Sequence, residues 1–260
     1  MPADSKPTVD KSKTQINGVY HALKFIFKYA KINNLIARDP TENLQKPTGY
    51  SHPRRALTAT ERRYFIQVGL TDRRYFYFML MLFCGCRPGE AAAAKGYDLS
   101  VRDRVPTLHI RGSKTDHADR FVPVPLELWD KIKRTPKDEY IAQTASGGPI
   151  TINNRRRIWN SLTRRINIAM GCRMYRNALV PPYPLSDDLV PYCLRHEYCT
   201  ELARRGVDIR IAQKLMGHAS IKMTANIYTN LETDDVITAA DAIGAVLPEK
   251  GATLGATSNR

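Results

Sequence analysis

One segment of the chain can only lie in the interior of a folded protein. Residues 74–85 read RYFYFMLMLFCG, and their apolar side chains would cover every side of a helix rather than one stripe. A helix that is apolar all round is buried by its neighbours or lies in a membrane. The segment is much shorter than the ~20 apolar residues that span a bilayer, and no other apolar run approaches that length. We therefore predict a central core helix and no membrane span.

The chain carries a large excess of positive charge. Its 260 residues include 40 Lys and Arg against 25 Asp and Glu, which gives a net charge of +15 and a pI near 9.7. Such an excess favours a polyanionic partner, usually nucleic acid, and a basic protein with scattered charge is the alternative. The N-terminal residues MPADSKPTVDKSKT contain no apolar signal core, so we expect a cytoplasmic protein.

The cysteines indicate reduced thiols. Five are present, an odd number without the regular spacing of a disulfide framework: Cys84, Cys86, Cys172, Cys193 and Cys199. A structural zinc site at Cys193, His196 and Cys199 is an alternative, but this run is helix-like and lacks a second pair of ligands. We therefore expect no metal and no cofactor.

The remaining patterns are mainly helical. Residues 14–37 carry an apolar stripe, and Thr58 with Glu61 forms the capping-box pattern at the start of a second helix. Residues 107–111 and 120–124 alternate in polarity around the polar loop GSKTDHAD, which predicts a β-hairpin. Further helices are predicted over 192–205, 209–216, 221–229 and 234–247, with Asp208 and Ser220 as N-caps and Gly217 as a stop. The fold class that follows is mainly α with a small β-hairpin or sheet.

Prolines suggest where the chain divides. The stretch DPTENLQKPTGYSHPRRA contains three prolines and is typical of a linker, so we place a boundary near residue 50. Residues 1–50 would hold a disordered start and a helical segment, and residues 51–233 the main domain. Residues 234–260 would form a last helix with an apolar face and a mobile tail.

Three basic residues lie beside glycine or polar residues where a core would be apolar. They are Arg87 in CGCRPGE, Lys114 in the hairpin loop and Arg195 in YCLRHEYC. Two guanidinium groups can grip one phosphodiester and neutralise the charge of its transition state. A tyrosine hydroxyl could act as the nucleophile and a lysine as the general acid. We find no clustered carboxylates spaced for two metal ions.

These segments together resemble the tyrosine recombinases, the phage integrase family. The string YCLRHEYCTELARRGVDIRIAQKLMGHASIKMTANIYTN is similar to the family's C-terminal signature. Upstream, LFCGCRPGEAAAAKGYDL resembles its first arginine box, and GSKTDHADRFVPVP resembles the hairpin that carries its lysine. INGVYHALKFIFKYAKINNLIARDPTENL resembles the last helix of the DNA-clamping domain. The resemblance covers residues 16–245, and the order and spacing of the boxes are more specific than any single box.

The resemblance implies a role for each matching residue. Tyr228 would attack the scissile phosphate and leave a 3′-phosphotyrosyl link, while Arg87 and Arg195 bind the non-bridging oxygens. His218 would hydrogen-bond the phosphate in the transition state, and Lys114 would protonate the leaving 5′ oxygen. Glu90, three residues after Arg87, would orient that arginine.

The chain departs from the family at two places. The second box usually begins with histidine or lysine three residues before its arginine, and Tyr192 stands there. A phenol can donate a hydrogen bond but is a poor base at neutral pH, so the base role assigned to this position is in doubt. We interpret the adjacent His196 as structural. At the front, only one or two helices of the clamp domain are recognisable, which predicts fewer phosphate contacts.

The resemblance also implies partners. We expect double-stranded DNA and a homo-oligomer, a dimer on one site and a tetramer in synapsis, with the helix at 234–247 docking on a neighbouring subunit or on its own domain. Accessory DNA-bending proteins are a further class of partner. The alternatives are a helix–turn–helix regulator that does not cut DNA and a type IB topoisomerase. The arginines of the helix NNRRRIWNSLTRRINIAM could face DNA or form a solvated surface: Arg155, Arg156, Arg157, Arg164 and Arg165.

Overall fold

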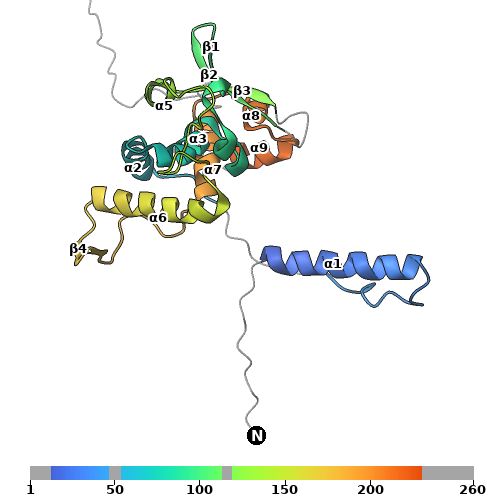
Figure 1. Ribbon diagram of the computed structural model, residues 1–260. Coiled ribbons are helices and arrows are strands. Elements are labelled where there is room, and N and C mark those ends of the chain that lie inside the picture. Colours follow the sequence, from blue (N-terminus) through green and yellow to red (C-terminus); the bar gives the residue numbers. More distant parts are fainter. Residues whose placement is uncertain (1–12, 47–53, 113–118, 230–260) are drawn as a thin grey trace, which may run out of the picture. The chain divides into compact units, whose positions relative to one another are not determined.

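A computed structural model describes residues 13–46, 54–112 and 119–229, which fall into two units divided between residues 53 and 54. The first unit contains helix α1 (Lys13–Ile32), drawn in blue in Figure 1, followed by turns. Most of the predicted apolar stripe of α1 is exposed, with Val19 at 60% and Ile26 at 57% of their full accessibility. The predictions for the first twelve residues, the helix at 234–247 and the C-terminal tail lie outside the described residues.

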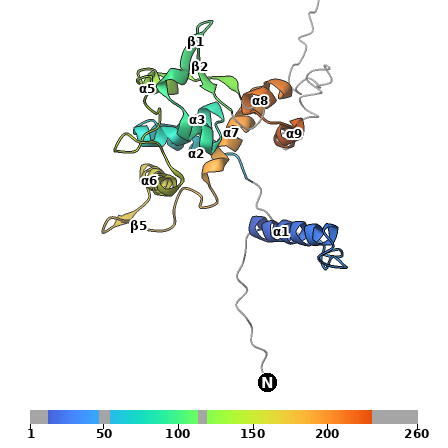
Figure 2. The ribbon, with the colours of Figure 1, turned by 45° about the vertical axis from the view of Figure 1, so that its right-hand side comes forward.

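The apolar segment at 74–85 forms the centre of the second unit, as predicted. Helix α3 (Phe76–Cys84) is buried along its whole length, and both Cys84 and Cys86 are inaccessible to solvent. It packs most extensively against α7 (Pro191–Arg204), and the two helices lie together in the middle of the unit in Figures 1 and 2. Within the described ranges, no helix has the length and hydropathy needed to cross a membrane.

Further helices surround this pair. Helix α2 follows the predicted capping box, in which the Thr58 hydroxyl accepts from Glu61 N and the Glu61 carboxylate accepts from Thr58 N. The elements between the central pair, the sheet and the C-terminal helices are α2 (Ala59–Gly69), η1 (Arg73–Tyr75), α4 (Pro88–Ala93), η2 (Gly96–Asp98), α5 (Leu126–Ile132), α6 (Ile152–Ala169), β4 (Met174–Tyr175) and β5 (Ala178–Leu179).

A small antiparallel sheet lies at one end of the unit, with strand order β1 (Leu99–Arg102), β2 (Val105–Ile110) and β3 (Arg120–Pro123). Strands β2 and β3 are the predicted hairpin, and Ile110 pairs with Arg120 across it. Strand β1 was not predicted. Its turn to β2 consists of Asp103 and Arg104, both with positive φ, whereas such two-residue turns usually contain glycine or asparagine.

Helix α8 (Ile209–Met216) has the predicted bounds, and α7 and α9 (Ile221–Tyr228) lie within one residue of theirs. Helix α8 is capped by the Asp208 carboxylate, which accepts from the N–H groups of Arg210 and Ile211. It ends at Gly217, whose φ of 62° is the left-handed conformation that favours glycine. Helix α9 follows the Ser220 cap after a short turn, so the two helices lie beside one another (Figure 2).

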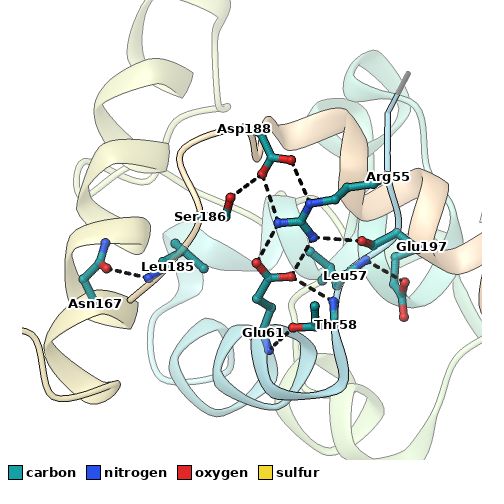
Figure 3. A network of polar contacts seen from close by, with 10 residues as sticks. Arg55, Leu57, Thr58, Glu61, Asn167, Leu185, Ser186, Asp188 and Glu197 are labelled. Carbon is teal, nitrogen blue, oxygen red and sulfur yellow. Dashed lines mark hydrogen bonds and ion pairs between the residues drawn. The ribbon is translucent and has the colours of Figure 1, made fainter. Parts of the chain in front are cut away.

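A single arginine fixes the start of the second unit (Figure 3). Arg55 donates to both oxygens of Glu61, at 2.8 and 2.7 Å, and to both oxygens of Asp188, at 2.8 and 2.9 Å. Asp188 also accepts from the Ser186 hydroxyl at 2.7 Å. The chain entering α2 is therefore tied to the loop that precedes α7.

We predict that Arg55→Ala lowers the free energy of unfolding by about 1–3 kcal/mol, because it leaves the buried Glu61 without its charged partner. Urea denaturation of the full chain measures this. The matched control is Arg205→Ala, which removes an exposed i,i+4 pair with Glu201 and should cost less than about 0.5 kcal/mol. Equal losses in the two variants would contradict the role of Arg55.

Candidate active site

The C-terminal end of α8 organises the site. The last carbonyls of a helix have no partner within it, and they lie at the negative end of its macrodipole. Here three successive carbonyls each accept from a different arginine. The bonds run from Arg120 Nε to Leu215 O at 2.7 Å, from Arg195 Nη2 to Met216 O at 2.6 Å, and from Arg87 Nη2 to Gly217 O. Arginines distant in sequence thus converge on one helix end.

The carboxylate of Glu90 contacts the same three arginines. It accepts from Arg87 N at 2.7 Å and Arg87 Nη1 at 2.8 Å, and from the two terminal nitrogens of Arg120 at 3.1 and 2.9 Å. Arg195 Nη1 lies 3.9 Å away. Burial favours a raised pKa, but the bonds from Arg120 and Arg87 lower the pKa of Glu90 below its ordinary value. Glu90 therefore orients Arg87, as expected, and also holds Arg120.

Arg195 is the most buried cation of the site, with 1% of its surface exposed. Its Nη1 donates to the carbonyl of Gly85, the residue that ends α3 in a left-handed conformation with φ of 60°. A side chain at Gly85 would meet the Tyr198 ring at 2.3 Å, so only glycine brings this carbonyl under Arg195. The Nε of Arg195 is buried without a hydrogen-bond partner. A buried unpaired donor on a cation indicates a place for an anion.

His218 follows the α8 stop directly and lies against the arginines. Only 6% of it is exposed, and its Nδ1 lies 2.9 Å from the Thr224 hydroxyl on α9. Burial, followed by the charges of Arg195, Arg87 and Arg120, lowers the pKa of His218 to about 4. The imidazole is therefore neutral at pH 7, and the tautomer with its proton on Nε2 lets Nδ1 accept from Thr224.

The structure does not bring Tyr228 into this cluster. Its hydroxyl donates to the carbonyl of Val207 in the turn between α7 and α8, at 2.9 Å. Burial raises the pKa of Tyr228 to about 12. The ring is half-buried and packs beside Tyr198, Cys199 and Met216. The phenol is therefore neutral and engaged with the backbone in this conformation.

Two predicted site residues remain, Tyr192 and Lys114, and only Tyr192 lies within the described residues. Tyr192 is half-buried in the first turn of α7, and the guanidinium carbon of Arg54 lies 4.3 Å from its ring centroid. His196, one turn later, is half-buried, and its structural interpretation stays a prediction. Lys114 lies outside the described residues, as does the rest of the loop at 113–118.

Sequence reasoning missed Arg120. Arg120 is 7% exposed, and it lies with Val122 on the inward face of β3, where buried and less buried residues alternate. An arginine at an inward position of an alternating strand was the available signal, because a buried arginine needs anionic partners.

Comparisons with known proteins identify the family of the chain. The sequence model of the Phage integrase family matches residues 56–234. The chain belongs to the phage integrase family. It is 30% identical over 219 residues to the tyrosine recombinase XerA of Pyrococcus furiosus, covering 83% of this chain and 69% of that protein. It is 27% identical to XerC of Pseudomonas savastanoi pv. phaseolicola, covering 89% and 74%. By family and relatives, the enzyme is a tyrosine recombinase.

Solved structures show the same fold. The Tn1549 transposon integrase in complex with transposon right end DNA superposes with a TM-score of 0.68 at 21% identity, covering 90% of this chain and 81% of that one. A lambda integrase dimer bound to a core site gives 0.56 at 19% identity, covering 88% and 67%. The mainly α fold with a small sheet is therefore that of tyrosine recombinase catalytic domains.

We predict that Glu90→Gln lowers the free energy of unfolding by about 3–5 kcal/mol, since it leaves buried guanidinium groups without their shared carboxylate. Glu127→Gln, at an exposed position, serves as the control and should change stability by less than about 0.5 kcal/mol. Sulfate should stabilise Glu90→Gln more than the wild type in a thermal melt. Equal sulfate effects would contradict this electrostatic account.

The lowered pKa of His218 predicts a pH dependence of stability. The unfolded state binds a proton near pH 6.5 and the folded state only near pH 4, so the folded state loses stability as the pH falls through this interval. The gap corresponds to at most about 3 kcal/mol. Denaturant titrations from pH 7 to pH 4 should therefore show a shallower decline for His218→Gln than for the wild type. Parallel curves would contradict the prediction.

Proposed function

We propose that this recombinase cleaves and rejoins DNA at specific sites through a 3′-phosphotyrosyl intermediate, and that it integrates and excises a mobile element. The observation that carries the proposal is the arginine cluster at the end of α8. Arg87, Arg120 and Arg195 face one carboxylate, Glu90, beside the neutral His218. The cluster retains a positive charge that a phosphodiester would compensate.

The groups that would bind the scissile phosphate are Arg87, Arg195 and His218. The side chain of Arg87 is 36% exposed, so it can reach a ligand from solvent. Arg195, whose Nε is unpaired but buried, would supply a second donor once the site opens to the phosphate. A neutral His218 with its proton on Nε2 supplies a third, and Thr224 would hold that tautomer. Such fixed donors stabilise the charge that develops on the phosphate oxygens.

Tyr228 would be the nucleophile. Its oxygen would form a bond to phosphorus while the bond from phosphorus to the 5′ oxygen breaks, and the phenolic proton would leave to water. Before this step the hydroxyl must release the Val207 carbonyl, by rotation of the Tyr228 side chain or by a shift of α9. Lys114 would protonate the departing 5′ oxygen, because its ammonium group can act as a general acid. A 5′ hydroxyl of a partner duplex would then attack the phosphotyrosine, which needs no ATP.

The wider surface would bind duplex DNA. Of the five α6 arginines, Arg155 contacts the Tyr77 hydroxyl at 3.4 Å and Arg164 contacts Asn177 O at 2.7 Å. The other three are exposed and supply cations for phosphates: Arg156, Arg157 and Arg165. We further propose assembly as a dimer on one site and a tetramer in synapsis, with the segment 234–247 docking on a neighbouring subunit. The mobile-element role is supported by similarity to the Tn1549 transposon integrase.

A suicide DNA substrate, nicked near the cleavage point, tests the proposal. The wild type should form a covalent protein–DNA adduct that persists on a denaturing gel, and Tyr228→Phe should form none. Tyr175→Phe changes an exposed tyrosine on β4 and should retain the adduct. Absence of an adduct on the correct site would favour a non-cleaving regulator, and relaxation of supercoiled DNA by the monomer would favour a topoisomerase.

A further inference from the structure

Arg54 lies over the residue that departs from the family pattern. Tyr192 stands where the second box usually has histidine or lysine, so this position of α7 lacks a side chain that can carry a positive charge. The Arg54 guanidinium stacks on the Tyr192 ring at 4.3 Å. Arg54 therefore brings a cation to the position that lacks one, from a distant part of the sequence.

The backbone beside Arg54 is firmly held (Figure 3). Arg55 is bound to Glu61 and Asp188, and its Nη1 also donates to Ala56 O at 3.0 Å. Leu57 is buried, and its N–H donates to the Glu197 carboxylate at 3.0 Å. Because the three residues after it are fixed against α2 and α7, Arg54 enters this region from an anchored position.

Tyr192 connects Arg54 to the candidate site. Residues three apart on a helix are neighbours, so Tyr192 lies beside Arg195 on α7. Burial is the main cause that lowers the pKa of Arg195, and Tyr192 lies close enough to interact with it electrostatically. On the other side, His196 has a pKa lowered by burial and by the charge of Arg54. The guanidinium of Arg54 thus lies at the first turns of α7, over the residue three positions before Arg195.

The charge of Arg54 is not compensated there. Arg54 is exposed and, within the described part of the chain, forms no ion pair, in contrast to Arg55. The first turn of α7 contains no acidic residue, and a helix N-terminus carries partial positive charge. A cation at this end of a helix is mildly unfavourable, and a bound anion would offset that cost.

We propose that Arg54 is a phosphate-binding residue of the active site, held by the Tyr192 ring and supplying the cation that Tyr192 cannot. The inference rests on the proposed function, since the anion it assigns is the backbone phosphate of the DNA at or next to the cleavage point. Arg54 and Tyr192 then act as one unit, in which the ring orients the guanidinium and the guanidinium carries the charge.

A double-mutant cycle on the nicked substrate tests this inference. Arg54→Ala should lower kcat/KM for adduct formation roughly 10- to 100-fold, the range for a hydrogen bond to a charged group, and Arg54→Lys should lose less. In a Tyr192→Lys background, which restores a cation at the second box, Arg54→Ala should cost less than about threefold. For DNA binding, the slope of log K against log salt concentration should become less steep by about 1 in Arg54→Ala.

The matched control is Arg63→Ala. Arg63 is also exposed and stacks on a tyrosine, Tyr64, at 5.0 Å, but lies on α2. It should leave the cleavage rate unchanged, and equal thermal melts would show that all variants are folded. If the wild type forms the Tyr228 adduct but Arg54→Ala behaves as Arg63→Ala does, only this inference fails. If the wild type forms no adduct, the proposed function fails and the inference with it. An equal loss from Arg54→Ala in both backgrounds would also overturn the pairing with Tyr192.

Discussion

The arrangement of the site depends on the electrostatics of one helix end. Arg87, Arg120 and Arg195 come from three different elements, and their guanidinium groups would repel one another in a region of low dielectric. The carbonyls at 215–217 and the carboxylate of Glu90 hold them together. These acceptors provide one full negative charge and the partial charge of a helix end. The cluster therefore contains less negative charge than positive, and this net positive charge is what the proposed phosphate would compensate.

Helix α9 places two different functions on one short element. Thr224 contacts His218, and Tyr228, four residues later on the same face, contacts Val207. A movement that frees the Tyr228 hydroxyl therefore affects the bond that orients His218, unless the helix changes shape between the two residues. The hydrogen bonds of Tyr228 and His218 are in this way linked through about one turn of helix.

Local sequence signals predicted most of the fold. The caps at Asp208 and Ser220 and the stop at Gly217 act over a few residues, so they could be read without knowledge of the tertiary structure. Strand β1 was missed because Asp103 and Arg104 form a tight turn without its usual residues.

The parts of the site that were missed depend on long-range packing. Arg120 contacts Glu90, 30 residues earlier, and Leu215, 95 residues later. Arg54 lies over Tyr192, which is more than a hundred residues away in the chain. The Tyr228 hydroxyl was expected beside the phosphate ligands as the nucleophile, but its position depends on how α9 packs against the turn after α7. No local pattern records such contacts.

Anchoring through backbone carbonyls has a consequence for how the sequence can vary. The arginines recognise the peptide groups of Leu215, Met216 and Gly217, so the side chains at 215 and 216 contribute to packing rather than to the geometry of the cluster. Insertion or deletion of one residue within α8 would rotate these carbonyls by about 100° about the helix axis. The element therefore tolerates exchange of residue identity far better than a change of length.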